Sequence, residues 1–210
     1  MRQTVLVYGD SNTHGSGPAP DAQSPYRLPY EDRWVNVMAR DLGPDVRVID
    51  EGMPGRTTVL DEPVDGPAYN GLRVLPAILA SHAPIDLLVV MLGTNDLQYQ
   101  YGFRTHDVAR ALERYVLDVR ALGKAADLML IAPVPVREIG TYAVNYQGAE
   151  ARQKGMSEAI KALALRLKTG FFDAASVAEI SPLDGVHLDI ENHHKLGRAM
   201  ARAVGERLLP

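Results

Sequence analysis

Short hydrophobic runs alternate with amphipathic stretches along the whole chain. The runs are bounded by turn-forming residues and have the length of β-strands. They lie at Thr4–Tyr8, Val46–Ile49, Ile85–Leu92, Leu128–Ala132 and Gly170–Phe172. The third run is almost continuously apolar, which is typical of a central parallel strand covered on both faces.

The stretches between these runs repeat their apolar residues at helical spacing. Pro76 falls inside the second stretch, where we expect a kink or a late helix start, because proline cannot donate a backbone hydrogen bond. In the fourth stretch an apolar stripe is assigned to core packing; it comprises Ile160, Leu163, Ala164 and Leu167. The helices are expected at Glu31–Leu42, Asn70–His82, Asp107–Leu122, Ala149–Lys168 and Glu191–Leu208.

This regular alternation of strands and helices indicates a parallel sheet with helices on both faces. We expect a three-layer α/β/α, flavodoxin-like fold, with five strands in the order 2-1-3-4-5 and one domain spanning residues 1–210. Right-handed crossovers place functional loops at the carboxyl ends of the strands. The loops Gly17–Pro29 and Pro133–Gln147 are long for a compact domain, and such loops are often functional.

Composition narrows the class of protein. The net charge is −4 and no Lys/Arg run occurs, which argues against nucleic acid or an anionic membrane as the main partner. The absence of cysteine excludes a disulfide, a thiolate metal site and a cysteine nucleophile. The start of the sequence lacks a signal-peptide pattern, and no apolar run approaches the ~18 residues that span a bilayer. We therefore expect a soluble, cytoplasmic protein.

Three residues have the chemistry of a nucleophile and its base. Ser11 follows the first strand in a Gly-flanked turn that can expose its hydroxyl, although a serine there is also a common helix N-cap. Asp184 and His187 lie three residues apart on one loop. The carboxylate can therefore reach ring Nδ1 and leave Nε2 for the serine hydroxyl. This set predicts acyl transfer through an acyl-enzyme.

Further donors follow other strands. Asn95 comes directly after the most hydrophobic strand, and its amide can donate to a developing oxyanion, although asparagine is also a common turn former. Gly52 follows the second strand and can add its backbone N–H, as can Ser11 after the first. Ordinary turn chemistry does not readily explain these three positions together with the loop that carries His187.

These positions resemble the four blocks of the SGNH (GDSL-type) hydrolase superfamily. The resemblance covers almost the whole chain and implies the SGNH hydrolase fold, with Ser11 as nucleophile, His187 as base and Asp184 orienting it. It also implies an oxyanion hole of Ser11, Gly52 and Asn95, with no metal and no cofactor. The matching strings are Gly9-Asp10-Ser11-Asn12, Gly52, Gly93-Thr94-Asn95-Asp96 and Asp184-Gly185-Val186-His187.

Two longer strings, at 51–58 and 181–189, resemble one branch of that superfamily. The branch contains arylesterases and acyltransferases noted for perhydrolysis and for transesterification in water. The resemblance implies a homo-oligomer, often an octamer. His14 stands where the branch often has Trp, which predicts a smaller and more polar pocket wall with altered acyl and acceptor preference.

Five residues near these blocks are expected to line the substrate pocket. They are Asp10, Asn12, His14, Arg56 and Thr94. A surface role for His14, and a solvated loop position or a subunit contact for Arg56, are open alternatives.

Other motifs carry less weight. His193 and His194 are adjacent on a predicted helix, so their side chains diverge and no shared metal is expected. The Gly-rich segment after the first strand is not followed by the Gly-Lys-Ser/Thr of a P-loop, and no Gly-x-Ser-x-Gly elbow occurs. The aromatic stretch 99–103 can form a pocket wall or a subunit contact, and Trp34 is assigned to a core or an interface.

The sequence therefore favours a serine esterase acting on short-acyl carboxylic esters, with water, an alcohol or peroxide as acyl acceptor. A carbohydrate O-acetyl deacetylase would use the same residues and is the first alternative. A non-catalytic, flavodoxin-like binding module is a remote one. Such a module predicts that the nucleophile, base or oxyanion residues are missing, whereas all are present.

Overall fold

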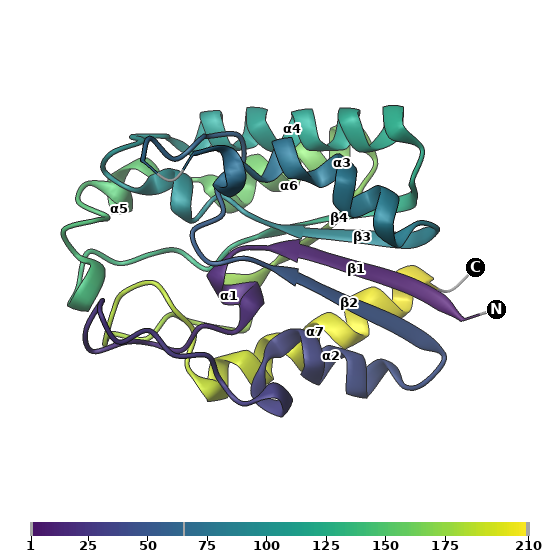
Figure 1. Ribbon diagram of the computed structural model, residues 1–210, viewed down its shortest axis with the longest axis horizontal. Coiled ribbons are helices and arrows are strands. Elements are labelled where there is room, and N and C mark those ends of the chain that lie inside the picture. The colour runs from purple at the N-terminus through teal and green to yellow at the C-terminus, as the bar shows by residue number, and fades with distance from the viewer. Residues whose placement is uncertain (1, 65, 209–210) are drawn as a thin grey trace.

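A sheet of five parallel strands forms the centre of the computed structural model, which describes residues 2–64 and 66–208 (Figure 1). The strand order is β2-β1-β3-β4-β5, and every adjacent pair is parallel. The predicted order 2-1-3-4-5 is confirmed. The strands are β1 (Gln3–Gly9), β2 (Val46–Gly52), β3 (Ile85–Met91), β4 (Ala125–Ala132) and β5 (Gly170–Asp173).

Helices cover both faces of this sheet, so the three-layer α/β/α fold is also confirmed. One face packs against α3, α4 and α6, and the other against α2 and α7 (Figure 1). The helices are α1 (Ser11–His14), α2 (Trp34–Leu42), α3 (Gly71–His82), α4 (Thr105–Leu122), α5 (Ala149–Arg152), α6 (Met156–Leu167) and α7 (Ile190–Leu208).

The central strand β3 supplies both hydrophobic cores. Leu88 and Val90 point to the face under α3, α4 and α6, whereas Leu87 and Val89 point to the face under α2 and α7. All four side chains are fully buried. Successive residues of a strand face opposite sides of the sheet, which explains why this run is apolar without alternation.

Several helix boundaries differ from the expectation. The helix expected from Glu31 begins at Trp34, because a separate 3-10 helix at Tyr30–Asp32 precedes it. The predicted helix Ala149–Lys168 is interrupted between α5 and α6, where Gly155 adopts a left-handed φ of +75°. The apolar stripe of α6 nevertheless packs in the core, as predicted. The late start expected around Pro76 is wrong, because α3 begins at Gly71 and continues past the proline; a kink there stays a prediction.

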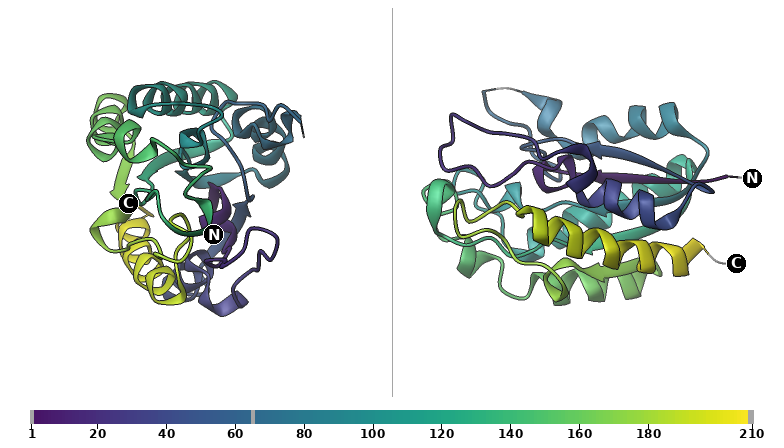
Figure 2. Two further views of the ribbon diagram at one scale, coloured as in Figure 1. Left: turned by 90° about the vertical axis from the view of Figure 1, so that its left-hand side faces the viewer. Right: turned by 90° about the horizontal axis from the view of Figure 1, so that it is seen from below.

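The loops that follow the strands gather at one end of the sheet (Figure 2). They include both long loops, Gly17–Pro29 and Pro133–Gln147, and the turn after each of β1, β2 and β3. In the described part of the chain, no helix is both long and apolar enough to cross a membrane.

The contact between α2 and α7 depends on a glycine. A methyl group added at Gly197 of α7 would lie 2.6 Å from Val37 Cβ and 2.7 Å from the carbonyl oxygen of Trp34. Gly205, further along the same helix, has only Leu42 Cδ2 near the equivalent position, at 3.7 Å.

We expect Gly197→Ala to lower the free energy of unfolding by about 1–3 kcal/mol, because overpacking outweighs the better helix propensity of alanine. The matched change Gly205→Ala should instead raise it by about 0.5–1 kcal/mol, because alanine loses less backbone entropy than glycine. Urea unfolding followed by circular dichroism measures both. Effects of the same sign at the two positions would contradict this account of the helix contact.

Candidate active site

The turn between β1 and α1 presents Ser11 at the loop end of the sheet. Asp10 is the N-cap of α1, and its Oδ1 accepts the backbone N–H of Asn12 at 3.0 Å. The alternative that Ser11 caps the helix is therefore wrong, and its hydroxyl is available for another partner. The Ser11 side chain lies in a nearly buried position beside the loop that precedes α7.

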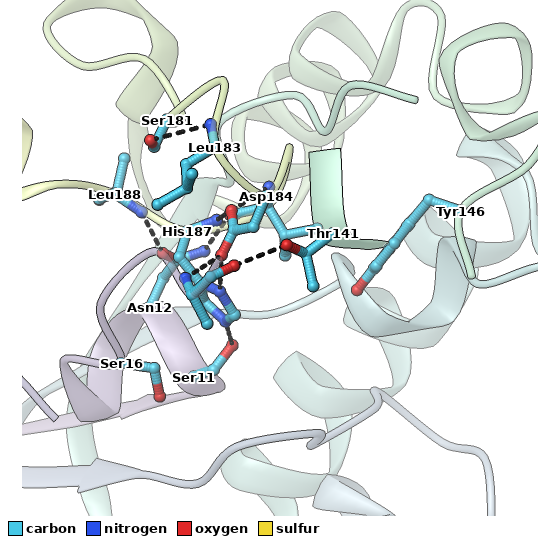
Figure 3. A network of polar contacts seen from close by, with 12 residues as sticks. Ser11, Asn12, Ser16, Thr141, Tyr146, Ser181, Leu183, Asp184, His187 and Leu188 are labelled. Carbon is cyan, nitrogen blue, oxygen red and sulfur yellow. Dashed lines mark hydrogen bonds and ion pairs between the residues drawn. The ribbon is translucent and has the colours of Figure 1, made fainter. Parts of the chain in front are cut away.

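That loop brings His187 and Asp184 to the serine. Ser11 Oγ lies 3.0 Å from His187 Nε2, and His187 Nδ1 lies 2.7 Å from Asp184 Oδ2 (Figure 3). An ionised carboxylate can only accept, so Nδ1 carries the proton and Nε2 accepts from the serine hydroxyl. This tautomer leaves the imidazole ready to take the serine proton.

Asp184 is completely buried and still ionised at neutral pH. Burial by itself would raise its pKa, but hydrogen bonds from the His187 ring and from backbone N–H groups outweigh it and hold the pKa below its usual range. Its Oδ1 accepts the N–H groups of Val186 and His187, both at 2.9 Å. Its Oδ2 also accepts the N–H of Ala19 at 3.1 Å.

Asn12 joins the serine turn to the histidine loop on both sides of His187. Its Nδ2 donates to the carbonyl of Val186 at 3.1 Å, and its Oδ1 accepts the N–H of Leu188 at 3.0 Å (Figure 3). The Tyr142 ring also meets the imidazole edge to face, with ring centres 5.7 Å apart. The histidine loop is therefore held by contacts from two other segments, the serine turn and the loop after β4.

A cavity of about 210 Å³ opens beside Ser11 and His187. Both long loops that the sequence singled out contribute to its wall. The signal that pointed to them was their proline content and length, which did not identify individual residues. The wall also contains Ser16, Gly17, Ala19, Pro25, Pro54, Gly55, Asn95, Gln98, Tyr142, Asn145, Tyr146 and Val186.

Asn95 reaches this cavity from the turn of 3-10 helix Asn95–Leu97, which follows β3. Its Oδ1 accepts from Gln98 Nε2 at 3.1 Å and from the Tyr146 hydroxyl at 3.3 Å. Its Nδ2 donates to the carbonyl of Arg56 at 2.9 Å. The amide orientation is thus fixed, and the second hydrogen of Nδ2 is left for a ligand.

Gly52 is not placed as the sequence suggested. Its N–H donates to Asp50 Oδ1 at 2.9 Å, and its Cα faces the backbone of His14, where a Cβ would lie 2.1 Å from the nitrogen. Gly55, three residues later, lines the cavity instead, with a φ of +77°. Within the described residues, its N–H donates to no acceptor. The Pro54-Gly55 pair was the only sequence signal for this turn.

The five residues expected to line the pocket do not form the cavity wall; they are Asp10, Asn12, His14, Arg56 and Thr94. Asp10 and Asn12 are engaged in the contacts already described. Arg56 is buried, donates to the carbonyls of Gly9 and Glu51, and lies 4.1 Å from the centre of the Tyr8 ring. Its guanidinium therefore links the ends of β1 and β2 beneath the site.

His14 and Thr94 lie outside the cavity wall. His14 Nδ1 contacts Ser16 Oγ at 3.3 Å, so Ser16 rather than His14 forms the wall. Partial burial and the neighbouring arginines Arg27 and Arg33 lower the pKa of His14 to about 4, so this imidazole is neutral at pH 7. Thr94 lines a separate cavity, between α6 and the loop after β4.

Two buried carboxyl groups lie behind the serine turn. Burial raises the pKa of Asp10 to about 6, against the hydrogen bond from the Asn12 N–H. Burial likewise raises the pKa of Asp96 to about 6, against hydrogen bonds from the Thr58 N–H and hydroxyl. Neither lines the cavity.

The adjacent histidines have different partners. His193 is buried, accepts the Trp34 N–H at Nδ1 at 3.2 Å, and has a pKa lowered to about 4, mainly by burial. His194 Nε2 contacts Asp32 Oδ1 at 2.8 Å. Trp34 itself is fully buried in the core under α7. Among residues 2–64 and 66–208, no cluster of His, Cys, Asp or Glu is arranged to hold a metal ion.

Comparison with known proteins agrees with this fold. The GDSL-like lipase/acylhydrolase family matches residues 7–194, and the chain belongs to that family. It is therefore an SGNH-type esterase, and a non-catalytic binding module is not supported. A search of curated proteins finds no significant match.

Several solved structures share the whole fold. The aryl esterase of M. smegmatis is 33% identical with a TM-score of 0.93, and the match covers 98% of this chain and 100% of that one. Est24, a carbohydrate acetylesterase from Sinorhizobium meliloti, is 34% identical with a TM-score of 0.93 and the same coverage. A carbohydrate acetylesterase family member from the same organism is 37% identical, with a TM-score of 0.89 over 98% of this chain and 99% of that one.

Proposed function

We propose that this protein hydrolyses short-acyl carboxylic esters, such as aryl and alkyl acetates, through an acyl-enzyme on Ser11. The observation that supports this most strongly is the hydrogen-bonded series from Ser11 Oγ through His187 to Asp184, beside a small cavity. A nucleophile in contact with a base, which is itself oriented by a third group, has the geometry of nucleophilic catalysis.

In the proposed reaction, Ser11 Oγ attacks the ester carbonyl while His187 Nε2 takes the serine proton. Asp184 stabilises the imidazolium that forms, because its carboxylate is already hydrogen-bonded to Nδ1. His187 then returns the proton to the leaving alkoxide. Water enters, loses a proton to His187 and attacks the acyl-serine. The bond between the acyl carbon and Ser11 Oγ then breaks, and His187 gives the proton to Oγ, which releases the carboxylic acid and restores Ser11. No metal or cofactor takes part in these steps.

The proposed oxyanion hole consists of the N–H groups of Ser11 and Gly55 and the free hydrogen of Asn95 Nδ2. All three residues line the cavity, and within the described residues neither backbone N–H has another acceptor. Gly55 takes the place expected for Gly52, whose N–H is occupied by Asp50. Each such donor typically contributes about 2.7–4 kcal/mol to transition-state stabilisation.

The size of the cavity supports a small acyl group. Its volume of about 210 Å³ is below the roughly 300–1,000 Å³ of pockets that hold drug-sized ligands. Rigid proline and tyrosine side chains, from Pro25 and Tyr142, form part of the wall. We propose that alcohols or hydrogen peroxide can replace water at the second step, which would give acyltransferase or perhydrolase side activity.

A carbohydrate O-acetyl deacetylase is the second candidate. Its support is the likeness to Est24, a carbohydrate acetylesterase, which equals the likeness to the aryl esterase. A homo-oligomer, the octamer that the resemblance implies, one domain over residues 1–210 and a cytoplasmic location stay predictions. Light scattering measures the first two.

Ser11→Ala should lower the initial rate of p-nitrophenyl acetate hydrolysis at least about 10³-fold, because the acyl-enzyme can no longer form. The wild type should hydrolyse the acetate faster than the butyrate, and the butyrate faster than the octanoate. The loop variant Ser24→Ala, in which an exposed serine is changed, should match the wild type. Equal activity of Ser11→Ala and the wild type would reject the mechanism, and equal rates on acetate and octanoate would reject the short-acyl preference.

Asn95→Ala should lower kcat for the same acetate by about 10²–10³-fold, because one oxyanion donor is lost. KM should change little, since the donor acts mainly on the transition state. Asn36→Ala, which removes an amide on α2 away from the cavity, serves as the control. A change in KM alone would show that Asn95 binds the substrate without stabilising the oxyanion.

Phenyl acetate and acetylated xylose separate the two candidate functions. We expect a higher kcat/KM for phenyl acetate, because the wall of the small cavity is formed largely by apolar atoms. Both substrates deliver the same acetyl group to Ser11, so the ratio of their kcat/KM values reports on the leaving group alone. A higher kcat/KM for acetylated xylose would favour the deacetylase.

A further inference from the structure

The loop after β4 is fixed on the loop that carries Asp184. Gly140 approaches that loop so closely that a Cβ would lie 2.2 Å from the carbonyl oxygen of Leu183. The backbone of Thr141, the next residue, is therefore held at a set position relative to Asp184. Three backbone hydrogen bonds join the two loops, from Arg137 N–H to Gly185, from Thr141 N–H to Leu183 and from Tyr142 N–H to Asp184.

From this position Thr141 reaches a third segment. Its hydroxyl donates to the carbonyl of Ala19 at 2.7 Å. The N–H of Ala19 in turn donates to Asp184 Oδ2 at 3.1 Å. The same oxygen accepts from His187 Nδ1 (Figure 3). The contacts form a closed ring, which runs from Asp184 through the loop after β4 to Thr141, on to Ala19 and back to the carboxylate.

The segment that carries Ala19 is stiff and has one donor. Ala19 stands between Pro18 and Pro20, which have no N–H. Pro18 fixes its own φ, and Pro20 restricts Ala19 to extended conformations. A small shift of the Ala19 carbonyl therefore moves its N–H as well, and the segment offers no other amide to Asp184.

The donor from Ala19 differs from the other backbone donors to Asp184. The N–H groups of Val186 and His187 belong to the same loop as the carboxylate and move with it. Ala19 lies 165 residues away in the sequence, so its N–H holds the carboxylate against a separate part of the molecule.

We propose that Thr141 is a positioning residue for the ester hydrolysis. By holding the Ala19 carbonyl, its hydroxyl directs the Ala19 N–H at Asp184 Oδ2 and fixes the carboxylate plane against His187. This inference rests on the proposed roles of Ser11, His187 and Asp184. Thr141 is not part of the cavity wall, so its hydroxyl acts on kcat and not on KM.

The first test is Thr141→Val, which removes the hydroxyl and keeps the branched shape. With p-nitrophenyl acetate, kcat should fall about three- to ten-fold at unchanged KM, the effect expected for one lost hydrogen bond. Thr141→Ser should restore kcat. The control is Thr169→Val, at the residue that precedes β5. It removes a buried hydroxyl for which residues 2–64 and 66–208 supply no hydrogen-bond partner, and it should leave kcat unchanged.

A proton NMR signal reports on the same contact without turnover. The low-field resonance of the His187 Nδ1 proton should broaden or move upfield in Thr141→Val, because the carboxylate that accepts this proton is less well oriented. It should return in Thr141→Ser. An unchanged resonance together with an unchanged kcat in Thr141→Val would overturn the proposal.

A double-mutant cycle separates positioning of Asp184 from a general structural role. In an Asp184→Ala background, Thr141→Val should cause no further loss of kcat, because no carboxylate is left to orient. A full additional loss would overturn the proposal. If Asp184→Ala does not fold, the proposal is judged on two other results. These are the His187 Nδ1 proton resonance of Thr141→Val and the recovery of kcat in Thr141→Ser. A fully active Thr141→Val beside an inactive Ser11→Ala would reject this inference alone, whereas an active Ser11→Ala would reject the proposed function.

Discussion

The site depends on one constraint: the carboxylate of Asp184 must stay ionised where water does not reach it. A buried charge is tolerated only when it is paired and fully hydrogen-bonded. Asp184 meets this condition with four donors, of which one is the imidazole, two belong to its own loop and one comes from Ala19. The same contacts that stabilise the charge also set the tautomer of His187 and direct its Nε2 at Ser11. Stability and reactivity therefore share one set of hydrogen bonds.

The parallel sheet makes this set possible. Each strand ends at the same edge, so turns that are distant in the sequence meet there. The ends of β1 and β3 supply Ser11 and Asn95, while the loop before α7 supplies His187. Side-chain amides then fix the distances between these turns: Asn12 joins the serine turn to the histidine loop, and the Asn95 amide is oriented by Gln98 and Tyr146. The rigid sheet lies behind all of them, with both faces of β3 in hydrophobic cores.

Sequence patterns predicted the sheet well, because strand length and apolar periodicity are local properties. They were less reliable for helix ends. The apolar stripe of α6 continues the spacing seen before it, yet Gly155 breaks the helix with a left-handed φ that periodicity does not reveal. Site prediction shows the same division. Residue types and spacing pointed to Ser11, Asp184 and His187, whereas the donor expected at Gly52 is occupied by Asp50, and Gly55 faces the cavity in its place.

The sequence by itself determined the strand order, the layers and the chemical groups that an ester hydrolase needs. Those features follow from hydrophobic patterning and from side-chain chemistry, which each residue carries wherever it lies. Only the tertiary structure decided which groups form the cavity wall. Arg56 could have faced substrate, but its guanidinium donates to two backbone carbonyls and packs against the Tyr8 ring. Thr141 and Ala19 carry no motif, and their relation to Asp184 exists only because two long loops fold over the same carboxylate.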